Sequence, residues 1–373
     1  MSDKPQYSRF ALCDWSHYWL TQAQTGGVRE ESGPWRYPDR CFAARVARGY
    51  NAARRDAVPH LIAPRRDGPV QERFELLLPA GRLMVNPRAA LLELAHLARR
   101  YQVKLWLTSD FLDDTQARRR FVRRPQDFVW VWSETLHFLQ RNGLLDTVAA
   151  VDFCQNFAAP ASVAGASRRL FGQAAGQWLA DVGIWPEAVE QRLQAYLHEV
   201  PRTLRALFPN VAFGVSCNLH TEKPLRLLDT TELDFIDGRF LLNQDLPFRL
   251  ASGALLPTTH PLLTRARQHA TQWVWQTAKP QWQARLEDRL SRHADFTRVR
   301  RLQCALTGGF VSASSRYDYD WGWVKEVSEF AIDAALQKNA LVLSPAAQAQ
   351  PLHQQAWQDV AWLQAVNRKI LRG

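Results

Sequence analysis

Short apolar runs alternate with longer amphipathic segments from one end of the chain to the other. This alternation is typical of βα units built around a parallel sheet. The apolar runs predict strands at residues 10–13, 51–58, 103–108, 147–152, 211–216, 233–236, 302–306 and 340–343. The amphipathic segments predict helices at 41–48, 87–101, 125–142, 186–208, 321–337 and 357–371, and a mostly helical region at 257–300 that is interrupted near Pro280.

Eight strand-and-helix units in a chain of 373 residues predict an α/β fold, a single (β/α)8 TIM barrel over residues 1–373. A doubly wound open sheet is the alternative, because periodicity alone cannot show that a sheet closes. No glycine-rich nucleotide-binding sequence follows the first strand, which disfavours the open sheet. The Ala-, Gly- and Ser-rich stretch from Ala158 to Gly176 is interpreted as a loop over one face rather than as a linker between domains.

The net charge of +11 comes from short, separated basic clusters, such as residues 118–120 with 123–124. A basic surface attracts nucleic acid and other anions. However, no basic tail, zinc-ligand spacing or RNA-binding aromatic motif accompanies the charge. A solvated, arginine-rich surface is therefore favoured, and nucleic acid is not an expected partner.

The five cysteines lack metal-ligand spacing, and four of them lie in or beside predicted strands. We interpret them as small buried thiols and predict neither a metal nor another cofactor. The first ten residues contain Asp3, Lys4 and Arg9 and no apolar signal-peptide core. No apolar run approaches the length of a transmembrane helix. We expect a cytoplasmic protein without membrane insertion.

In a barrel of this kind, function lies at the carboxyl ends of the strands. Polar residues gather at the predicted ends: Asp14 and His17; Arg54, Asp56 and His60; Ser109 and Asp110; Asp152, Gln155 and Asn156; Asn218 and His220; Asp237 and Arg239; and Thr307. Aromatic residues lie near them in the sequence, at Trp15, Tyr18, Trp19, Tyr317, Trp321 and Trp323. Sugar sites combine hydrogen-bonding side chains for the hydroxyl groups with flat rings for the apolar face of the sugar.

Five segments, in this order, resemble those of the cellulase-like, clan-A glycoside hydrolases. They are Asp14-Trp15, residues 49–60 (GYNAARRDAVPH), residues 105–109 (LWLTS), residues 143–146 (GLLD) leading into 151–154 (VDFC), and residues 321–326 (WGWVKE). The resemblance runs over nearly the whole chain and rests on the order and spacing of the segments together. It implies a barrel that acts on β-linked sugars with retention. That mechanism uses two carboxyl groups about 5–5.5 Å apart, one as acid/base and one as nucleophile.

Two positions depart from what the resemblance implies. Asn156 stands at the place of the acid/base glutamate, and Gly308 stands at the place of the nucleophilic glutamate. An amide has no proton to give at neutral pH, and glycine has no side chain, so the usual two-step chemistry is expected to be lost. Arg239 stands where the resemblance implies a histidine. Arg54 matches an arginine that holds the nucleophile and binds sugar hydroxyl groups.

We therefore predict a substrate-binding groove and assign no catalytic residue; the predicted groove residues are Trp15, Arg54, Gln155, Asn156, Arg239 and Trp323. Structural roles are the alternative. Gln155 and Asn156 could be ordinary strand-end residues, Arg54 could belong to the barrel scaffold, and Gly308 could form a tight turn. Asp152 is interpreted as a buried hydrogen-bonding residue. At least one of Trp321 and Trp323 is expected to pack into the core.

Three functions remain open from the sequence. The first is a glycoside-hydrolase-like barrel that binds a carbohydrate without cleaving it by the two-glutamate mechanism. The second is an active hydrolase of β-linked glycans with displaced carboxylates, for which the candidates are Asp56, Asp110, Asp237, Asp318 and Glu222. An inverting enzyme tolerates carboxyl groups about 6.5–9.5 Å apart. The third is a scaffold or partner-binding protein. If a glycan binds, the arginine-rich surface favours an acidic polysaccharide.

Overall fold

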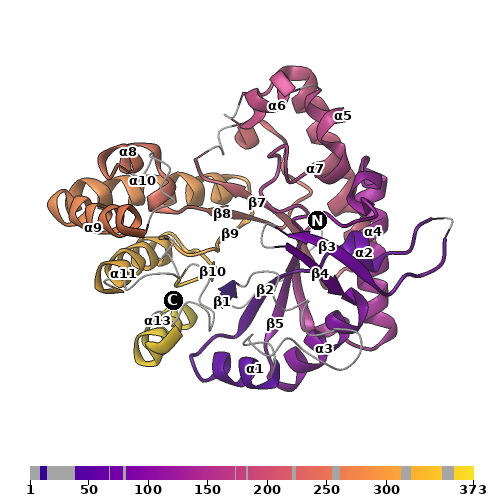
Figure 1. The fold of residues 1–373 in the computed structure, drawn as a ribbon, viewed down its shortest axis with the longest axis horizontal. Helices are drawn as coiled ribbons and strands as arrows, with labels where there is room; N and C mark the ends of the chain where they lie inside the picture. Colours follow the sequence, from indigo (N-terminus) through magenta and orange to yellow (C-terminus); the bar gives the residue numbers. More distant parts are fainter. Residues whose placement is uncertain are drawn as a thin grey trace.

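The computed structural model describes residues 9–14, 38–66, 68–78, 81–172, 174–181, 184–220, 224–253, 261–311, 321–346 and 357–373. Its centre is a closed barrel of parallel strands (Figure 1). The strands are β1 (Phe10–Asp14), β2 (Ala52–Asp56), β5 (Lys104–Thr108), β6 (Val148–Asp152), β7 (Ala212–Asn218), β8 (Phe235–Arg239), β9 (Gln303–Leu306) and β10 (Val342–Leu343). They pair in chain order and β10 closes on β1. The predicted strands and the (β/α)8 TIM barrel are confirmed, and the open sheet is wrong.

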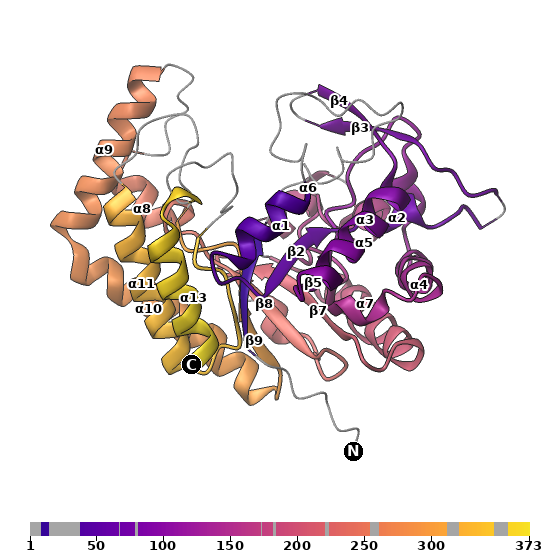
Figure 2. The same cartoon turned by 90° about the horizontal axis from the view of Figure 1, so that it is seen from below.

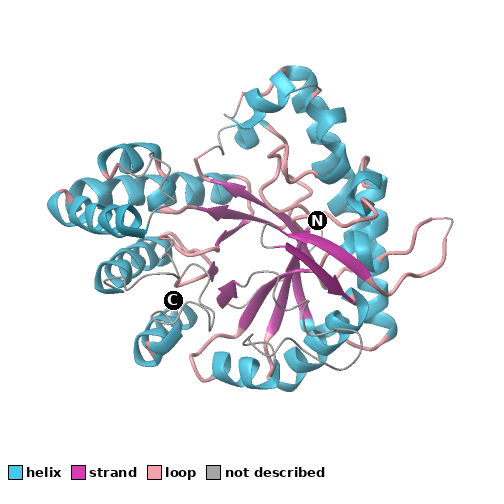
Figure 3. Cartoon of the chain, viewed as in Figure 1, coloured by secondary structure: helices cyan, strands magenta, loops and turns pink. Residues whose placement is uncertain are grey.

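Helices surround the barrel, as Figure 3 shows. The main ones are α1 (Pro38–Val46), α3 (Pro87–Arg100), α4 (Pro125–Arg141), α7 (Glu187–Leu207), α9 (Pro261–Thr277), α10 (Lys279–Val299), α11 (Trp321–Gln337) and α13 (Val360–Arg372). The predicted helical region at 257–300 divides at Ala278, and Pro280 lies in the first turn of α10. A proline is tolerated there because the first backbone N–H groups of a helix have no partner within the helix. In Figure 2, α9 projects past the end of the barrel.

Two features differ from the sequence prediction. The first is an unpredicted antiparallel hairpin, β3 (Phe74–Leu78) and β4 (Gly81–Val85), which follows the short helix α2 (Pro59–Ile62). Its strand β3 is tied to the loop after β5, since the Leu77 N–H donates to the Asp113 carbonyl over 2.8 Å.

The second difference lies in the stretch 158–176, which we expected to be a loop. It contains the 3-10 helix η5 (Ala164–Ala166), the helix α5 (Ser167–Phe171) and the start of α6 (Ala174–Asp181). Leu170 and Phe171 are buried. Packing of these two side chains accounts for helix in a stretch whose Gly and Ser content favours loops.

The barrel interior follows the two-residue period of a strand. Its lower layer is apolar and is formed by Phe10, Leu12, Ala52, Trp106, Ala150, Ala212, Phe235, Ala305 and Val342. The rings of Trp106 and Phe235 meet edge-on, 4.4 Å apart. Two residues further along the strands, toward their carboxyl ends, the inward positions become polar: Arg54, Thr108, Asp152, Asp237 and Thr307.

Gly214 makes this packing possible. A Cβ at this position would lie 2.3 Å from the carbonyl oxygen of Phe235 and 2.7 Å from its ring.

Gly214→Ala is therefore expected to destabilise the fold by about 3 kcal/mol, since neither the strand nor the ring can move freely. Gly143→Ala is the control. Gly143 has a positive φ, but nothing lies within 4 Å of the place that a methyl group would take, and its cost should be about 1 kcal/mol. Equal unfolding free energies for the two variants in urea would contradict this role of Gly214.

Candidate functional site

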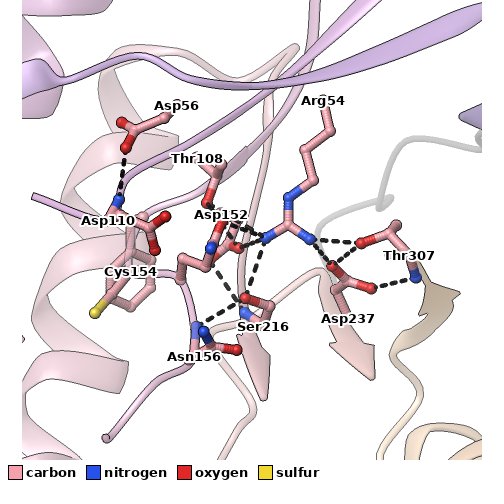
Figure 4. Close-up of polar contacts among 12 residues, drawn as sticks. Arg54, Asp56, Thr108, Asp110, Asp152, Cys154, Asn156, Ser216, Asp237 and Thr307 are labelled. Carbon is pink, nitrogen blue, oxygen red and sulfur yellow. Dashed lines mark hydrogen bonds and ion pairs between the residues drawn. The ribbon is translucent and has the colours of Figure 1, made fainter. Parts of the chain in front are cut away.

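The side chain of Arg54 occupies the centre of the barrel at the carboxyl ends of the strands (Figure 4). It is 0% exposed. Nη1 donates to Oδ2 of Asp237 over 2.6 Å, and Nη2 donates to Oδ2 of Asp152 over 2.7 Å. Nη1 also donates to the Thr307 hydroxyl. Arg54 therefore forms two charge-assisted hydrogen bonds with carboxylates that are themselves 0% exposed.

The two carboxylates are held in turn by the backbone. Oδ1 of Asp152 accepts from the N–H of Ser216 over 3.0 Å, and Oδ1 of Asp237 accepts from the N–H of Thr307 over 2.8 Å. Burial raises the pKa of Asp152, and the nearby Arg54 opposes that effect. One guanidinium faces two carboxylates, so both acids are committed to structure and neither is open to a substrate.

Gln155 and Asn156 follow β6 and border this cluster. The Gln155 side-chain oxygen accepts from Nη2 of Arg54 over 3.2 Å, so the oxygen end of its amide faces the buried guanidinium. Asn156 has a φ of 52°, in the left-handed region that asparagine tolerates better than most residues. Its backbone N–H donates to the Ser216 hydroxyl over 2.9 Å. Both residues are partly exposed.

Gly308 follows β9 with a φ of 88°. A Cβ at this position would lie 3.1 Å from Nε and 3.3 Å from Nη2 of Arg239. The guanidinium of the partly exposed Arg239 therefore lies where a side chain at position 308 would begin. A glutamate at 308 would meet both an unfavourable backbone conformation and this guanidinium.

Comparison with known proteins agrees with this architecture. Residues 12–371 match the model of a family described as sugar-binding and cellulase-like. The chain belongs to this cellulase-like family. No curated protein sequence matches it.

Solved structures show the same fold. A protein from Parabacteroides distasonis assigned to the glycoside hydrolases superposes with a TM-score of 0.80 at 20% identity, over 98% of this chain and 94% of the other. A family 5 broad-specificity endoglucanase from Clostridium longisporum gives 0.53 at 8% identity, covering 98% and 100% of the two chains. Another family 5 protein, solved in complex with a cellotriose, gives 0.53 at 12% identity, covering 97% and 99%. The names of these three structures thus point to glycoside hydrolases, two of them of family 5.

The cellulase-like barrel brings together four of the predicted groove residues, namely Arg54, Gln155, Asn156 and Arg239, with Gly308 beside Arg239. Arg54 is fully buried, so its side chain is not open to a ligand in this structure, which corrects the prediction of direct contact. Trp15 lies outside the described residues.

The prediction that Trp323 lines a groove is wrong. It is 2% exposed and belongs to the main hydrophobic core, because its position on α11 faces the barrel. The expectation that one residue of the Trp321 and Trp323 pair packs into the core is confirmed. Trp321 is partly buried, and its ring meets that of Trp362 edge-on at 5.3 Å.

Sequence reasoning missed the roles of Thr108 and Ser216. Both hydroxyl groups are buried and accept from Nη2 of Arg54, over 3.4 Å and 3.2 Å. The signal that could have found them was the two-residue period, since each residue continues the inward-facing row of its strand. The prediction of Asp152 as a buried hydrogen-bonding residue is confirmed.

A second pair of carboxyl groups lies at the ends of β2 and β5. Asp56 is 4% exposed and accepts from the N–H groups of Val58 over 2.8 Å and Asp110 over 3.0 Å. Burial, followed by the negative charge of Asp110, raises the pKa of Asp56 to about 8. Of the other displaced-carboxylate candidates, Asp237 is committed to Arg54, whereas Asp318 and Glu222 lie outside the described residues.

The structure also shows the state of the cysteines, and it bears on metal-binding groups and membrane-spanning helices. All five cysteines are buried and form no disulfide, which confirms their interpretation as buried thiols. In the described part of the chain, no group of three or more His, Cys, Asp or Glu side chains is placed to hold a metal ion. Nor does any described helix combine the length and apolarity needed to cross a membrane.

Arg54→Met is expected to destabilise the protein by about 3–5 kcal/mol, because it leaves Asp152 and Asp237 buried without their cation. The control is Arg298→Met, which breaks an exposed pair with Asp295 and should cost less than about 1 kcal/mol. Urea unfolding of the three proteins measures both values. If Arg54→Met lowers the free energy of unfolding no more than Arg298→Met does, the buried ion pairs of Arg54 do not stabilise the barrel.

The raised pKa of Asp56 predicts a pH dependence of stability. The pKa of Asp56 is about 8 in the folded protein and has the ordinary value of 3.8 in the unfolded chain. Between pH 3.8 and pH 8 the folded protein therefore keeps a proton on Asp56 that the unfolded chain has released. The stabilising contribution is complete below about pH 4 and is lost as pH rises toward 8. Relative to Asp56→Asn, the wild type should lose up to about 1.4 kcal/mol per pH unit between pH 5 and 8. A difference in unfolding free energy between the wild type and Asp56→Asn that stays constant from about pH 5 to 8, as measured in urea, would contradict the raised pKa of Asp56.

Proposed function

We propose that this cellulase-like barrel binds a β-linked carbohydrate at the carboxyl ends of its strands and does not cleave it by the two-glutamate retaining mechanism. The observation that carries the proposal is the environment of Gly308. The resemblance implies a nucleophilic glutamate at this position. Gly308 has a positive φ, and the guanidinium of Arg239 lies against the place that its Cβ would take. Asn156, at the implied acid/base position, supplies an amide in place of an acid.

The remaining groups suit recognition. The side-chain amides of Gln155 and Asn156 and the guanidinium of Arg239 all lie at partly exposed positions. Such planar hydrogen-bonding groups match the hydroxyl groups of a sugar. Arg54 and its two aspartates fix the strand ends from which these side chains project, so little conformational entropy should be lost on binding.

A second candidate function is hydrolysis by displaced carboxylates. The observation in its favour is the raised pKa of Asp56 beside Asp110, because a carboxyl group that keeps its proton near neutral pH can act as a general acid. Against it, both oxygens of Asp56 already accept backbone N–H groups and the side chain is almost fully buried. Binding without cleavage is therefore the function that the site supports better.

Calorimetric titration with hexasaccharides of β-1,4-linked glucose, β-1,4-linked mannose and β-1,3-linked glucose tests the proposal, with chromatography of each mixture afterwards. We expect binding of at least one hexasaccharide with no shorter products after about a day. Asn156→Ala with Arg239→Ala should weaken that binding about tenfold or more, through the loss of buried hydrogen bonds. A matched control, Arg141→Ala with Arg202→Ala, alters exposed arginines outside the site and should bind like the wild type.

Shorter products from the wild type would contradict the proposal. If Asp110→Asn then abolished them while binding persisted, the displaced-carboxylate enzyme would replace it. The absence of binding to every hexasaccharide would contradict carbohydrate recognition at this site for these linkages.

A further inference from the structure

A cluster of arginines surrounds two adjoining cavities of about 650 and 490 Å³ beside α4, away from Arg54. Both cavities are lined by Arg65 and Arg118. Their walls come from the loop between α2 and β3, the 3-10 helix η3 (Arg118–Phe121) and the first turns of α4. In Figure 1 this loop extends outward beside α2 and α4. We call this feature the arginine groove and define it by Arg65, Arg66, Arg73, Arg118, Phe121 and Trp130.

Four arginines line the two cavities, Arg65, Arg66, Arg73 and Arg118, together with two carboxylates, Glu72 and Asp127. Arg66 pairs with Asp127 over 3.0 Å. Within the described ranges, no carboxylate forms an ion pair with Arg65, Arg73 or Arg118. The negative charge of Asp114 does act on Arg118, but its two oxygens accept the backbone N–H groups of Gln116 and Arg118, each over 2.8 Å.

Arg118 is the most informative of these residues. It is 6% exposed, its guanidinium donates to the carbonyl of Ala63 over 2.7 Å, and it lies 5.6 Å above the ring of Phe74. Burial and the positive charge of Arg65 both lower its pKa. A buried cation with a like charge beside it is costly to maintain, and an anion bound in the cavity would remove that cost.

Flat apolar surface lies among these cations. The Phe121 ring is 60% exposed, and the guanidinium of Arg65 lies 5.4 Å above its centroid. Trp130 is partly buried, and its indole N–H donates to the carbonyl of Pro64 over 3.2 Å, which fixes the ring. A small inorganic anion needs no aromatic surface. A sugar ring that carries an acid group uses both, because its apolar face stacks on the ring while its acid group meets arginine.

The groove lies at the same end of the barrel as the strand-end site. Its loops follow β2 and β5, so they leave the barrel at the same end as Arg54. His60, which lines the smaller cavity, contacts the Leu112 carbonyl over 2.9 Å and lies four residues after Asp56. A chain of several sugars can therefore extend from one site toward the other across one end of the barrel.

We propose that the arginine groove binds the acid groups of an anionic polysaccharide whose chain continues to the strand ends. The inference rests on the proposed function and names its substrate class, a glycan that carries carboxylate or sulfate groups. Arg65 and Arg73 contact acid groups at the rim, and Arg118 does so from the buried wall. Arginine suits this role because its planar fork can bind a carboxylate through two parallel hydrogen bonds.

The test compares two hexasaccharides that differ mainly in charge, β-1,4-linked mannuronate and β-1,4-linked mannose, by calorimetry in about 50 mM salt. The wild type should bind the mannuronate hexamer about tenfold or more tightly than the mannose hexamer, and raising the salt to about 500 mM should remove most of that preference. Arg65→Glu with Arg73→Glu should abolish the preference. The control, Arg141→Glu with Arg202→Glu, makes the same change of net charge at exposed arginines outside the groove and should keep it.

Binding of the mannose hexamer tests the proposed function separately. If the wild type binds both hexamers equally, or if the groove and control variants lose the preference equally, the inference is overturned and the proposed function stands. If neither hexamer binds while single-stranded polyuridylate binds through Arg65 and Arg73, the groove is a nucleic-acid site and the inference fails. Circular dichroism of both variants confirms that the comparison is made on folded protein.

Discussion

The buried guanidinium of Arg54 is the interaction on which the strand ends depend. It contacts side chains from or directly after β5, β6, β7, β8 and β9, and it lies itself on β2. Six neighbouring strands thus share one cation that is buried from solvent. Because unpaired charges are expensive there, Asp152 and Asp237 hold the guanidinium between them and are themselves fixed by backbone N–H groups. This arrangement determines where the loops after β6 and β9 leave the barrel.

The same constraint underlies the proposal that the site recognises a glycan and does not hydrolyse it in two steps. The acids nearest the centre neutralise Arg54 and are 0% exposed, so no sugar can reach them. Gln155, Asn156 and Arg239 are partly exposed and carry hydrogen-bonding groups, and none of these three residues is a carboxylate. The cellulase-like fold is retained, whereas the groups at its two implied catalytic positions are an amide and a glycine.

Much of the fold could be predicted from the sequence because each strand is a short apolar run and each helix has an apolar face. The hairpin of β3 and β4 was missed because its stability depends on pairing with residues 113–115, which lie far away in the chain. The misassignment of Trp323 has a similar origin. Its place after a predicted strand end suggested a groove, but the orientation of α11 turns it into the core.

The candidate site was predictable to the extent that the inward row of residues follows strand periodicity. Arg54, Gln155, Asn156, Arg239 and Gly308 do meet, as the order of the strands requires. The sequence could not show which charged side chains pair with each other. Nothing in the residue types shows that Asp237 pairs with Arg54 and not with solvent, or that Arg239 covers Gly308. Both facts depend on side-chain directions that only the closed barrel fixes.

A crystal structure of the protein soaked with a β-linked oligosaccharide that it binds is the most direct test of this account. The account predicts an intact glycan at the strand ends, hydrogen-bonded to Gln155, Asn156 and Arg239, with no carboxylate in position to attack its anomeric carbon. A glycan bound elsewhere, a cleaved glycan, or one linked covalently to the protein would contradict it.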